Sequence, residues 1–245
     1  MKGIILAGGE GKRLEPLTKI VSKPLLPIYN KPLILYPLVT LKESGIYNIC
    51  IIVSPKNKTS IKKFLGDGKI FGVRLSYIVQ HTPKGMSDGI LRAKKFIGRD
   101  NVAVVCADNI FENTFKNEVV NFRSGGLIFV KKIKDPSHFG VVSYDKKGLP
   151  INLIEKPKKF VSHDAITGFY LYDNRVINAI KTLKPSARGE LEITDLHLWY
   201  LARGELKIQK VKGRWIDTGS FDALLEANLY SAEKARKNAT PTLPQ

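Results

Sequence analysis

Short apolar runs alternate with segments of helical period through the first half of the chain. The apolar runs are Gly3–Leu6, Ile49–Val53, Leu75–Val79 and Val102–Cys106. The segments of helical period lie near Pro32–Ser44, Ser60–Leu65 and Ser87–Phe96. Alternation of this kind predicts an α/β fold, with a mostly parallel central sheet and helices on both of its faces.

The second half of the chain has a different pattern, with strands that follow one another more closely. The expected strands are Leu127–Lys132, Gly140–Tyr144, Ile151–Ile154, Ile166–Tyr172 and Leu206–Val211. Helical patterns cover Asn174–Thr182, Leu191–Ala202 and Phe221–Lys234. These additional strands are expected to extend the sheet and to form a second wall of a cleft. Because no repeat or linker separates the halves, we expect one domain over residues 1–237, followed by a loose tail at 238–245.

Polar and glycine-rich segments follow three of the predicted parallel strands. They are Gly8–Arg13, Gln80–Gly85 and Ala107–Asn109. The carboxyl ends of parallel strands meet at one edge of a sheet, and ligands gather there in open α/β folds. The pattern therefore places a binding site at this edge.

Composition narrows the class of protein. The 245 residues are 43% hydrophobic and 25% charged, as in ordinary globular proteins. No apolar run is long enough to span a bilayer, and the first residues lack the features of a secretory signal. Cys50 and Cys106 lie in strand-like runs and are expected to be buried free thiols, which favours a cytoplasmic protein. The scattered histidines are expected in surface or loop positions rather than as metal ligands: His81, His138, His163 and His197.

The formal net charge of +18 allows two interpretations. A basic surface can bind nucleic acid. Here, however, the lysines occur as dispersed pairs, and aromatic side chains do not alternate with them as they would in a stacking platform. We therefore expect neither nucleic acid nor a membrane as a partner. Instead, we expect small polyanionic substrates, which the positive field would attract.

The stretch Lys2–Leu14 carries the most specific signal. Three glycines within four positions, Gly8, Gly9 and Gly11, are followed by Lys12 and Arg13. Exposed backbone N–H groups beside cations suit phosphates. The loop fits neither the Walker pattern nor the dinucleotide pattern, because the required Ser or Thr and the third glycine are missing.

Together with Ser22–Pro27, Ala107–Asn109, Glu155–Pro157 and Trp215–Gly219, this loop resembles the sugar-phosphate nucleotidyltransferases. The likeness is greatest to their glucose-1-phosphate thymidylyltransferase branch, and it extends from Lys2 to about residue 228. The resemblance implies a Rossmann-like nucleotidyltransferase fold, with a nucleotide-binding part at about 1–110 and a sugar-binding part at about 111–237.

The resemblance also implies the reaction and its partners. An oxygen of glucose 1-phosphate would attack the α-phosphorus of dTTP, giving dTDP-glucose and pyrophosphate, with Mg²⁺ as the cofactor. Use of UTP or of another sugar 1-phosphate is the alternative, and a non-catalytic nucleotide-binding relative is a further one. A homo-oligomer is expected by analogy. Because longer members carry additional C-terminal helices at an allosteric site, little feedback control is expected.

The family motifs assign roles to individual residues. The catalytic cations would be Arg13, Lys23 and Lys156. The nucleotide would contact Leu6, Gly8, Gly9, Gly11, Lys12, Gln80, Gly85 and Asp108. The sugar phosphate would contact Asn109, Gly140, Glu155, Lys156, Ile166, Tyr170 and Arg188. The metal ligands would be Asp108 and Asp217.

Several of these residues also have simpler interpretations. Asp108 alone could equally cap a turn. Lys23 alone could face solvent, and Glu155 with Lys156 could form an exposed ion pair of little consequence. The chain departs from the family pattern at Lys12, Met86, Ser87, Ala107 and Phe139. The last of these removes one expected hydroxyl contact with the sugar.

Overall fold

The computed structural model describes residues 1–239 and is built around a nine-stranded sheet. Its main path runs in the order β10-β9-β11-β6-β1-β4-β5, and β8 pairs with both β11 and β12. The strands are β1 (Lys2–Ala7), β4 (Asn48–Val53), β5 (Arg74–Val79), β6 (Val102–Cys106), β8 (Gly126–Lys132), β9 (Gly140–Tyr144), β10 (Pro150–Glu155), β11 (Asp164–Tyr172) and β12 (Leu206–Lys210). The α/β class is as predicted.

The four strands of the first half form the parallel part of the sheet. β1 lies at its centre, with β4 and β6 parallel to it on either side, and β5 is parallel to β4. Neighbouring side chains such as Ile4 and Ile5 point to opposite faces and are both fully buried, because both faces are covered. The strands added by the second half run largely antiparallel, and β11 joins them to β6.

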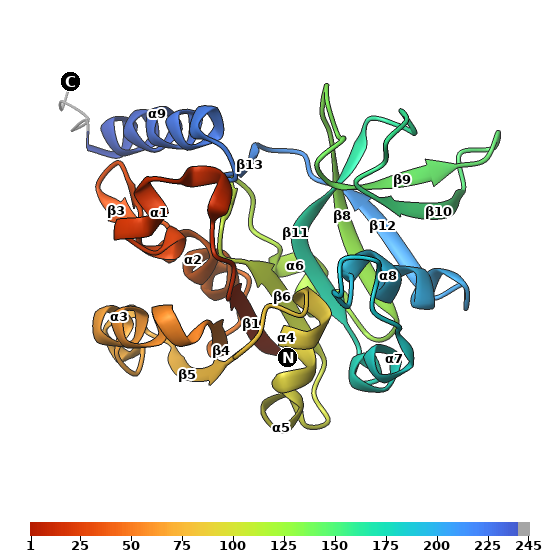
Figure 1. Ribbon diagram of the computed structural model, residues 1–245, viewed down its shortest axis with the longest axis horizontal. Helices are drawn as coiled ribbons and strands as arrows, with labels where there is room; N and C mark the ends of the chain where they lie inside the picture. The colour runs from red at the N-terminus through yellow and green to blue at the C-terminus, as the bar shows by residue number, and fades with distance from the viewer. Residues whose placement is uncertain (240–245) are drawn as a thin grey trace, which may run out of the picture.

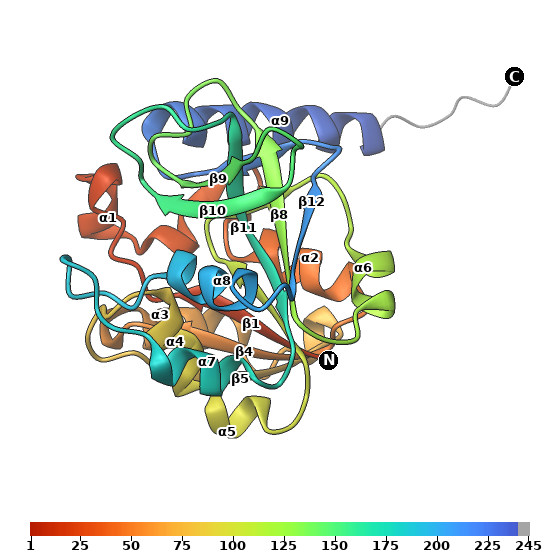
Figure 2. The ribbon, with the colours of Figure 1, turned by 90° about the vertical axis from the view of Figure 1, so that its right-hand side faces the viewer.

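Helices cover both faces of the sheet, as the two views show (Figures 1 and 2). One apolar core lies beneath α2 (Leu35–Glu43) and α3 (Pro55–Leu65), with α6 (Lys116–Asn121) at its margin. The core on the other face is contributed by α4 (Met86–Arg92), α5 (Lys94–Ile97), α7 (Val176–Thr182) and α8 (Ile193–Leu201). The predicted helix Ser87–Phe96 is thus two helices that meet at Ala93.

Several short elements have no periodic signal in the sequence. They are α1 (Leu17–Ile20), β2 (Pro27–Ile28), β3 (Lys31–Pro32), β7 (Asn109–Phe111) and β13 (Trp215–Asp217). The long helix α9 (Phe221–Ala239) packs on the small third core that β2, β7 and β13 help to form. It continues through the first two residues of the expected tail, and residues 240–245 lie outside the described residues.

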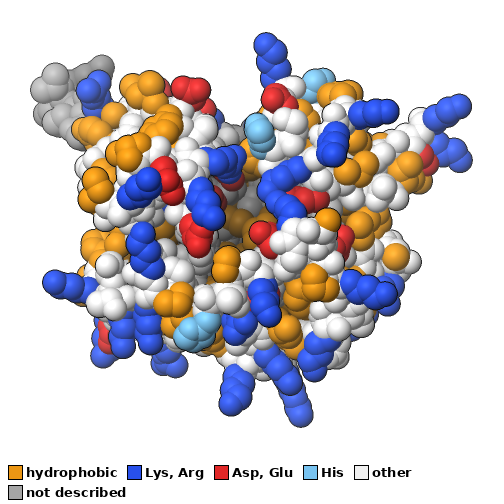
Figure 3. All heavy atoms as spheres, viewed as in Figure 1, with side chains coloured by type: hydrophobic (Ala, Val, Ile, Leu, Met, Phe, Trp, Pro, Cys, Tyr) orange, Lys and Arg blue, Asp and Glu red, His pale blue; other side chains and the backbone are white. Residues whose placement is uncertain are grey.

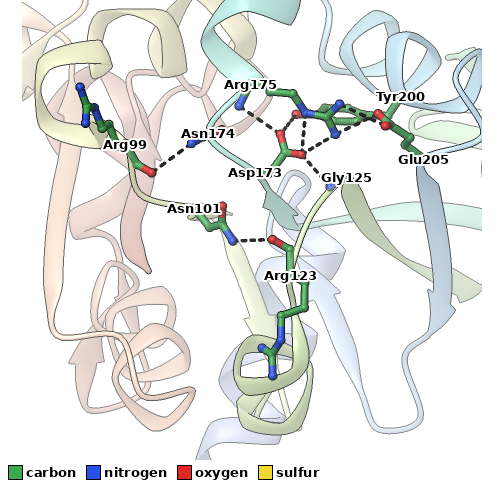
Figure 4. A network of polar contacts seen from close by, with 9 residues as sticks. All are labelled: Arg99, Asn101, Arg123, Gly125, Asp173, Asn174, Arg175, Tyr200 and Glu205. Carbon is green, nitrogen blue, oxygen red and sulfur yellow. Dashed lines mark hydrogen bonds and ion pairs between the residues drawn. The ribbon is translucent and has the colours of Figure 1, made fainter.

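A fully paired buried carboxylate joins the end of β11 to its neighbours (Figure 4). Asp173 accepts hydrogen bonds from the Gly125 backbone N–H at 2.7 Å and from the Tyr200 hydroxyl at 3.1 Å. The Arg175 guanidinium donates to it through Nε at 2.9 Å and Nη2 at 2.6 Å. Burial alone would raise the pKa of Asp173, but these hydrogen bonds outweigh it and lower the pKa.

One histidine lies where the sequence did not predict it. His81, His138 and His163 are exposed, as expected, but His197 is fully buried on the inner face of α8. Its Nε2 lies 2.6 Å from the Tyr172 hydroxyl. Burial lowers the pKa of His197 to about 3, so the ring is neutral. The prediction of a surface position was wrong because the packing of α8 on β11 has no signal in so short a segment.

The two cysteines are free, but only one is fully buried. Cys50 lies in the core of the sheet, whereas Cys106 is partly exposed at the end of β6. The prediction that both are buried was therefore wrong for Cys106, because its strand ends at a cavity. Among the described residues, no helix has the length and apolar character needed to cross a membrane.

Candidate active site

Two adjoining cavities open at the carboxyl ends of β1, β5 and β6, where the sequence predicted a site. Figure 3 shows a hollow on this face, with basic and acidic side chains around it. The first cavity, of about 250 Å³, includes the predicted residues Leu6, Gly8, Gly9, Lys23, Gln80, Gly85 and Asp108 in its lining. The second, of about 200 Å³, includes Arg13, Asp108, Asn109, Gly140, Glu155, Lys156, Ile166, Tyr170 and Asp217. Asp108, Met86 and Cys106 line both cavities.

The glycine loop brings bare backbone to the first cavity. A β-carbon on Gly8 would lie 2.9 Å from Oε1 of Gln80, a separation that real side chains do not tolerate. Gly11 has a φ of 70°, in the left-handed region that favours glycine, and a β-carbon there would press on Thr18 and Lys23. Gly11 therefore serves the shape of the loop, and it is not among the residues that line either cavity.

A short two-stranded sheet places Asp217 beside Asp108. β13 pairs antiparallel with β7, and Asp217 lies opposite Asn109 in this pairing. The Thr218 backbone N–H and hydroxyl both donate to the carbonyl oxygen of Asp108, at 2.9 and 3.0 Å. Residues that are 109 positions apart in the sequence are thereby fixed next to each other.

The Asn109 amide holds the two carboxylates together. Its Nδ2 donates to Asp108 Oδ1 at 2.9 Å and to Asp217 Oδ2 at 3.1 Å. Its Oδ1 accepts from the Gly168 backbone N–H at 2.9 Å and from Trp215 Nε1 at 2.5 Å. Asn109 was predicted to contact the sugar phosphate, but the protein already engages both ends of its amide. In this structure the amide bridges the two aspartates, and its contact with a sugar phosphate stays a prediction.

The pKa values of the two aspartates are shifted in opposite directions. Burial, followed by repulsion from the Asp108 carboxylate, raises the pKa of Asp217 to about 7. Burial alone would also raise the pKa of Asp108, but the Lys23 ammonium, 2.5 Å from its Oδ2, and the Asn109 amide lower it. Lys23 is itself buried, so the simple interpretation as a solvent-facing lysine does not hold.

This donor set fits a magnesium ion. Mg²⁺ prefers oxygen ligands and commonly takes one or two carboxylates from the protein, together with substrate phosphates and water. Among the described residues, no group of three or more histidine, cysteine, aspartate or glutamate side chains forms a metal cage. The pair Asp108 and Asp217 supplies two such carboxylates, and the ammonium of Lys23 now neutralises part of their charge. A bound cation would offset the repulsion from Asp108 that helps to raise the pKa of Asp217.

The second cavity is lined by groups that suit a sugar. A β-carbon on Gly140 would lie 3.0 Å from the Thr194 hydroxyl and 3.3 Å from Glu155 Oε2, so glycine keeps this cavity open. Thr194, which was not predicted, donates to Glu155 Oε2 at 2.5 Å. Lys156 follows with a φ of 46°, unusual for a side chain with a β-carbon and typical of functional sites.

Three further predicted cations, Arg188, Lys12 and Arg13, differ in their contacts and in how near they lie to the second cavity. Arg188 binds Glu192 through Nη2 at 2.8 Å, and the same nitrogen lies 3.6 Å from Glu155 Oε1. Glu155 lines the second cavity, whereas Arg188 is not among its lining residues. Lys12 is largely exposed, pairs with Glu10 at 3.0 Å and lines neither cavity. Arg13 lies close enough to Gly219 that any side chain there would collide with its guanidinium.

Comparison with known proteins identifies the family of this chain. The family described as "Nucleotidyl transferase" matches residues 2–234. The chain belongs to the nucleotidyl transferase family. Among curated relatives of this family member, the glucose-1-phosphate thymidylyltransferase of Neisseria meningitidis is 46% identical over 235 residues, which cover 93% of this chain and 81% of that protein. The enzyme of the same name from Mycolicibacterium smegmatis is 47% identical over 233 residues, with the same coverage.

Solved structures of family members have the same fold. A Bacillus anthracis structure described as a glucose-1-phosphate thymidylyltransferase, in complex with sucrose, superimposes with a TM-score of 0.89 at 41% identity, covering 94% of this chain and 95% of that one. A UDP-glucose pyrophosphorylase complexed with UDP-glucose gives 0.82 at 25% identity, covering 95% and 98%. The predicted Rossmann-like nucleotidyltransferase fold is confirmed.

Proposed function

We propose that this chain is a glucose-1-phosphate thymidylyltransferase that makes dTDP-glucose and pyrophosphate from dTTP and glucose 1-phosphate. The observation that carries the proposal is the carboxylate pair Asp108 and Asp217 at the junction of the two cavities. One cavity offers bare backbone and an amide to a nucleotide, and the other offers Glu155 and Lys156 to a sugar phosphate. The curated relatives carry this activity in their names.

The reaction needs positioning and charge neutralisation more than covalent chemistry. An oxygen of the sugar 1-phosphate forms a bond to the α-phosphorus of dTTP, and the bond from that phosphorus to the β-phosphate oxygen breaks. Arg13 and Lys23 would hold the triphosphate, and Lys156 with Arg188 would hold the attacking phosphate. A magnesium ion bound by Asp108 and Asp217 would supply positive charge for the phosphate oxygens.

Two of these roles require exchange of ion-pair partners. The Lys23 ammonium lies 2.5 Å from Asp108 Oδ2. If a cation bound this oxygen, Lys23 would turn toward a phosphate. Arg188 must share its guanidinium between Glu192 and the sugar phosphate. Both side chains keep a carboxylate beside them, so neither is left as an unpaired charge when the site is empty.

Pyrophosphate release in the presence of Mg²⁺ and glucose 1-phosphate tests the proposal, with dTTP, UTP, dCTP and dATP compared side by side. We expect the largest kcat/KM with dTTP. A preference for UTP would move the assignment to the uridylyltransferase alternative. No release with any triphosphate, or with other sugar 1-phosphates, would contradict nucleotidyl transfer altogether.

A matched pair of variants tests the sugar-phosphate side. Lys156→Met removes the cation that lines the second cavity, whereas Lys158→Met removes an exposed lysine two residues away. We expect Lys156→Met to lower kcat/KM for glucose 1-phosphate by about 10²-fold, the scale of one lost electrostatic contact to the reacting groups. Lys158→Met should have no effect, and equal losses in both variants would contradict the assignment.

A further inference from the structure

The amide of Gln80 is held in a single orientation by two acceptors. Its Nε2 donates to the Gly85 carbonyl oxygen at 3.0 Å and to Asp88 Oδ2 at 2.8 Å. A primary amide has two N–H groups, so both are used. If the amide were flipped, its carbonyl oxygen would face a carbonyl and a carboxylate, with no hydrogen atom between them. The two acceptors therefore fix which end of the amide faces the cavity.

The free end of this amide points into the first cavity. Among the described residues, no donor reaches Gln80 Oε1. The same oxygen lies beside the glycine loop, because a β-carbon on Gly8 would come within 2.9 Å of it. Gln80 lines the cavity together with Gly8 and Gly85. The cavity therefore presents a lone acceptor that needs a donor from the ligand.

The Asp88 carboxylate is in turn held in place by an ion pair with Arg92. It lies on α4 with only 7% of its surface exposed, and Arg92, one turn later, donates through Nε to Asp88 Oδ2 at 2.8 Å. A second guanidinium nitrogen of Arg92 lies 3.4 Å from Oδ1. The carboxylate thus has a fixed position and an unambiguous role, because an ionised carboxylate can only accept hydrogen bonds.

From this arrangement we infer that Asp88 is a positioning residue for base selection: it locks the Gln80 amide with Oε1 toward the base and thereby favours an imide N–H over a ring-nitrogen acceptor. Thymine and uracil carry a hydrogen on N3, which Oε1 can accept. Cytosine has a lone pair at N3, which Oε1 repels, and a flip of the amide that would relieve this repulsion is blocked. The inference rests on the proposed function, since it concerns the base of the same nucleotide.

The test compares kcat/KM for dTTP with that for dCTP in three variants. Asp88→Leu keeps the approximate shape and removes the acceptor, so we expect the dTTP preference to fall by about tenfold, as the Gly85 carbonyl alone remains. Asp88→Asn retains one acceptor oxygen and should restore most of the preference. Arg92→Met is the matched control: it removes the guanidinium that helps to fix Asp88 but leaves both acceptors of the Gln80 amide in place, so the dTTP preference should fall less than in Asp88→Leu.

The preference ratio separates this role from a merely structural one. Loss of activity toward dTTP and dCTP by the same factor in Asp88→Leu would overturn the inference. If that variant does not fold, NMR of the wild-type enzyme decides: both protons of the Gln80 side-chain NH₂ should be protected from exchange with solvent, because both donate hydrogen bonds. Exchange of these two protons as fast as in a solvent-exposed glutamine would contradict the lock.

Failure of the proposed function would be visible separately. Absence of nucleotidyl transfer in the wild-type enzyme contradicts the proposed function alone. The binding constants of dTDP and dCDP, measured by calorimetry for the wild-type enzyme and Asp88→Leu, then give the same ratio without turnover. We expect the wild-type enzyme to bind dTDP more tightly than dCDP. In Asp88→Leu the ratio of the two dissociation constants should fall by about tenfold, and an unchanged ratio would overturn the inference.

Discussion

Two carboxylate sites in this molecule, one buried and one half-buried, differ in how completely the protein satisfies them. Asp173, at the end of β11, accepts hydrogen bonds from a backbone N–H, a hydroxyl and a guanidinium, and these lower its pKa. Asp217, at the cleft, has one amide donor and a second carboxylate beside it, and its pKa rises to about 7. The first site is satisfied by the folded chain alone, whereas the second is the one where we propose that a cation binds.

The contrast separates stability from function. A satisfied carboxylate contributes to folding, because removing it strands its donors without partners. An unsatisfied pair lowers stability and is retained where it binds or reacts with something. In this molecule Asp108 of the less satisfied pair lines both the first and the second cavity, whereas the satisfied carboxylate of Asp173 lies in the polar network of Figure 4.

The largest expected effect is on turnover when the unsatisfied pair is broken. Asp217→Asn should lower kcat for pyrophosphate release by about 10²–10³-fold, the scale of one lost electrostatic stabiliser. Its melting temperature should be unchanged or higher, because the repulsion from Asp108 disappears. Asp108→Asn should lose most turnover as well. Near-native kcat in either variant would contradict the cation site.

The converse change breaks the satisfied site. Asp173→Ala should lower the free energy of unfolding by about 2–4 kcal/mol, chiefly because the Gly125 N–H and the Tyr200 hydroxyl lose their acceptor. The ion pair itself adds less, since the Arg175 side chain is 41% exposed. Turnover per folded molecule should not change.

The control for Asp173→Ala is Asp100→Ala, which removes a half-exposed carboxylate paired with Lys2. Denaturant unfolding of the control should shift by less than about 1 kcal/mol. Equal shifts in the two variants would mean that the burial and hydrogen bonding of Asp173 add nothing to the free energy of unfolding beyond what an exposed ion pair adds.

A third buried titratable group sharpens the comparison through pH. Unfolded His197 takes up a proton near pH 6.5, whereas the folded state resists protonation until pH is about 3. Unfolding free energy should therefore fall as pH decreases below 6.5, by about 1.4 kcal/mol per pH unit from this group. We would measure the unfolding free energy of wild type and His197→Gln by denaturant titration at several pH values between 7 and 5. Below pH 6.5 the free energy of the variant should depend less steeply on pH, by that slope, and an equal pH dependence in the two proteins would refute the assignment.

The smallest expected effect concerns an exposed charge near the site. The Lys12 side chain is 78% exposed and pairs with Glu10. Lys12→Thr should change KM for dTTP by no more than about threefold, and the change should shrink as salt is added. A tenfold or larger change, insensitive to salt, would instead place Lys12 in direct contact with the triphosphate.

The sequence predicted the parts of this molecule that have a regular pattern. The runs that became β1, β4 and β6 are continuous and apolar because both of their faces are buried. The carboxyl ends of β1 and β6, with that of the edge strand β5, open on the two cavities where we expected a site. Family motifs brought Asp108 and Asp217 together in advance, although nothing in the spacing alone does so.

What the sequence did not predict depends on long-range pairing. β7 and β13 are three residues each and carry no usable period, yet they set the distance between the two aspartates. The buried position of His197 and the closed hydrogen bonds of Asn109 arise from contacts with distant strands. Asp88 has no signal at all in the sequence, because its role depends on the rotamer of Gln80.

The most direct test of the account is a Mn²⁺ titration followed by electron paramagnetic resonance, with Mn²⁺ as a probe for Mg²⁺ and dTTP present. The account predicts that wild-type enzyme and Asp173→Ala bind the ion alike, and that Asp217→Asn binds it at least about tenfold more weakly, the scale of one lost ligand interaction. Equal Mn²⁺ affinity in the wild-type enzyme and Asp217→Asn would contradict the claim that the unsatisfied pair holds the cation.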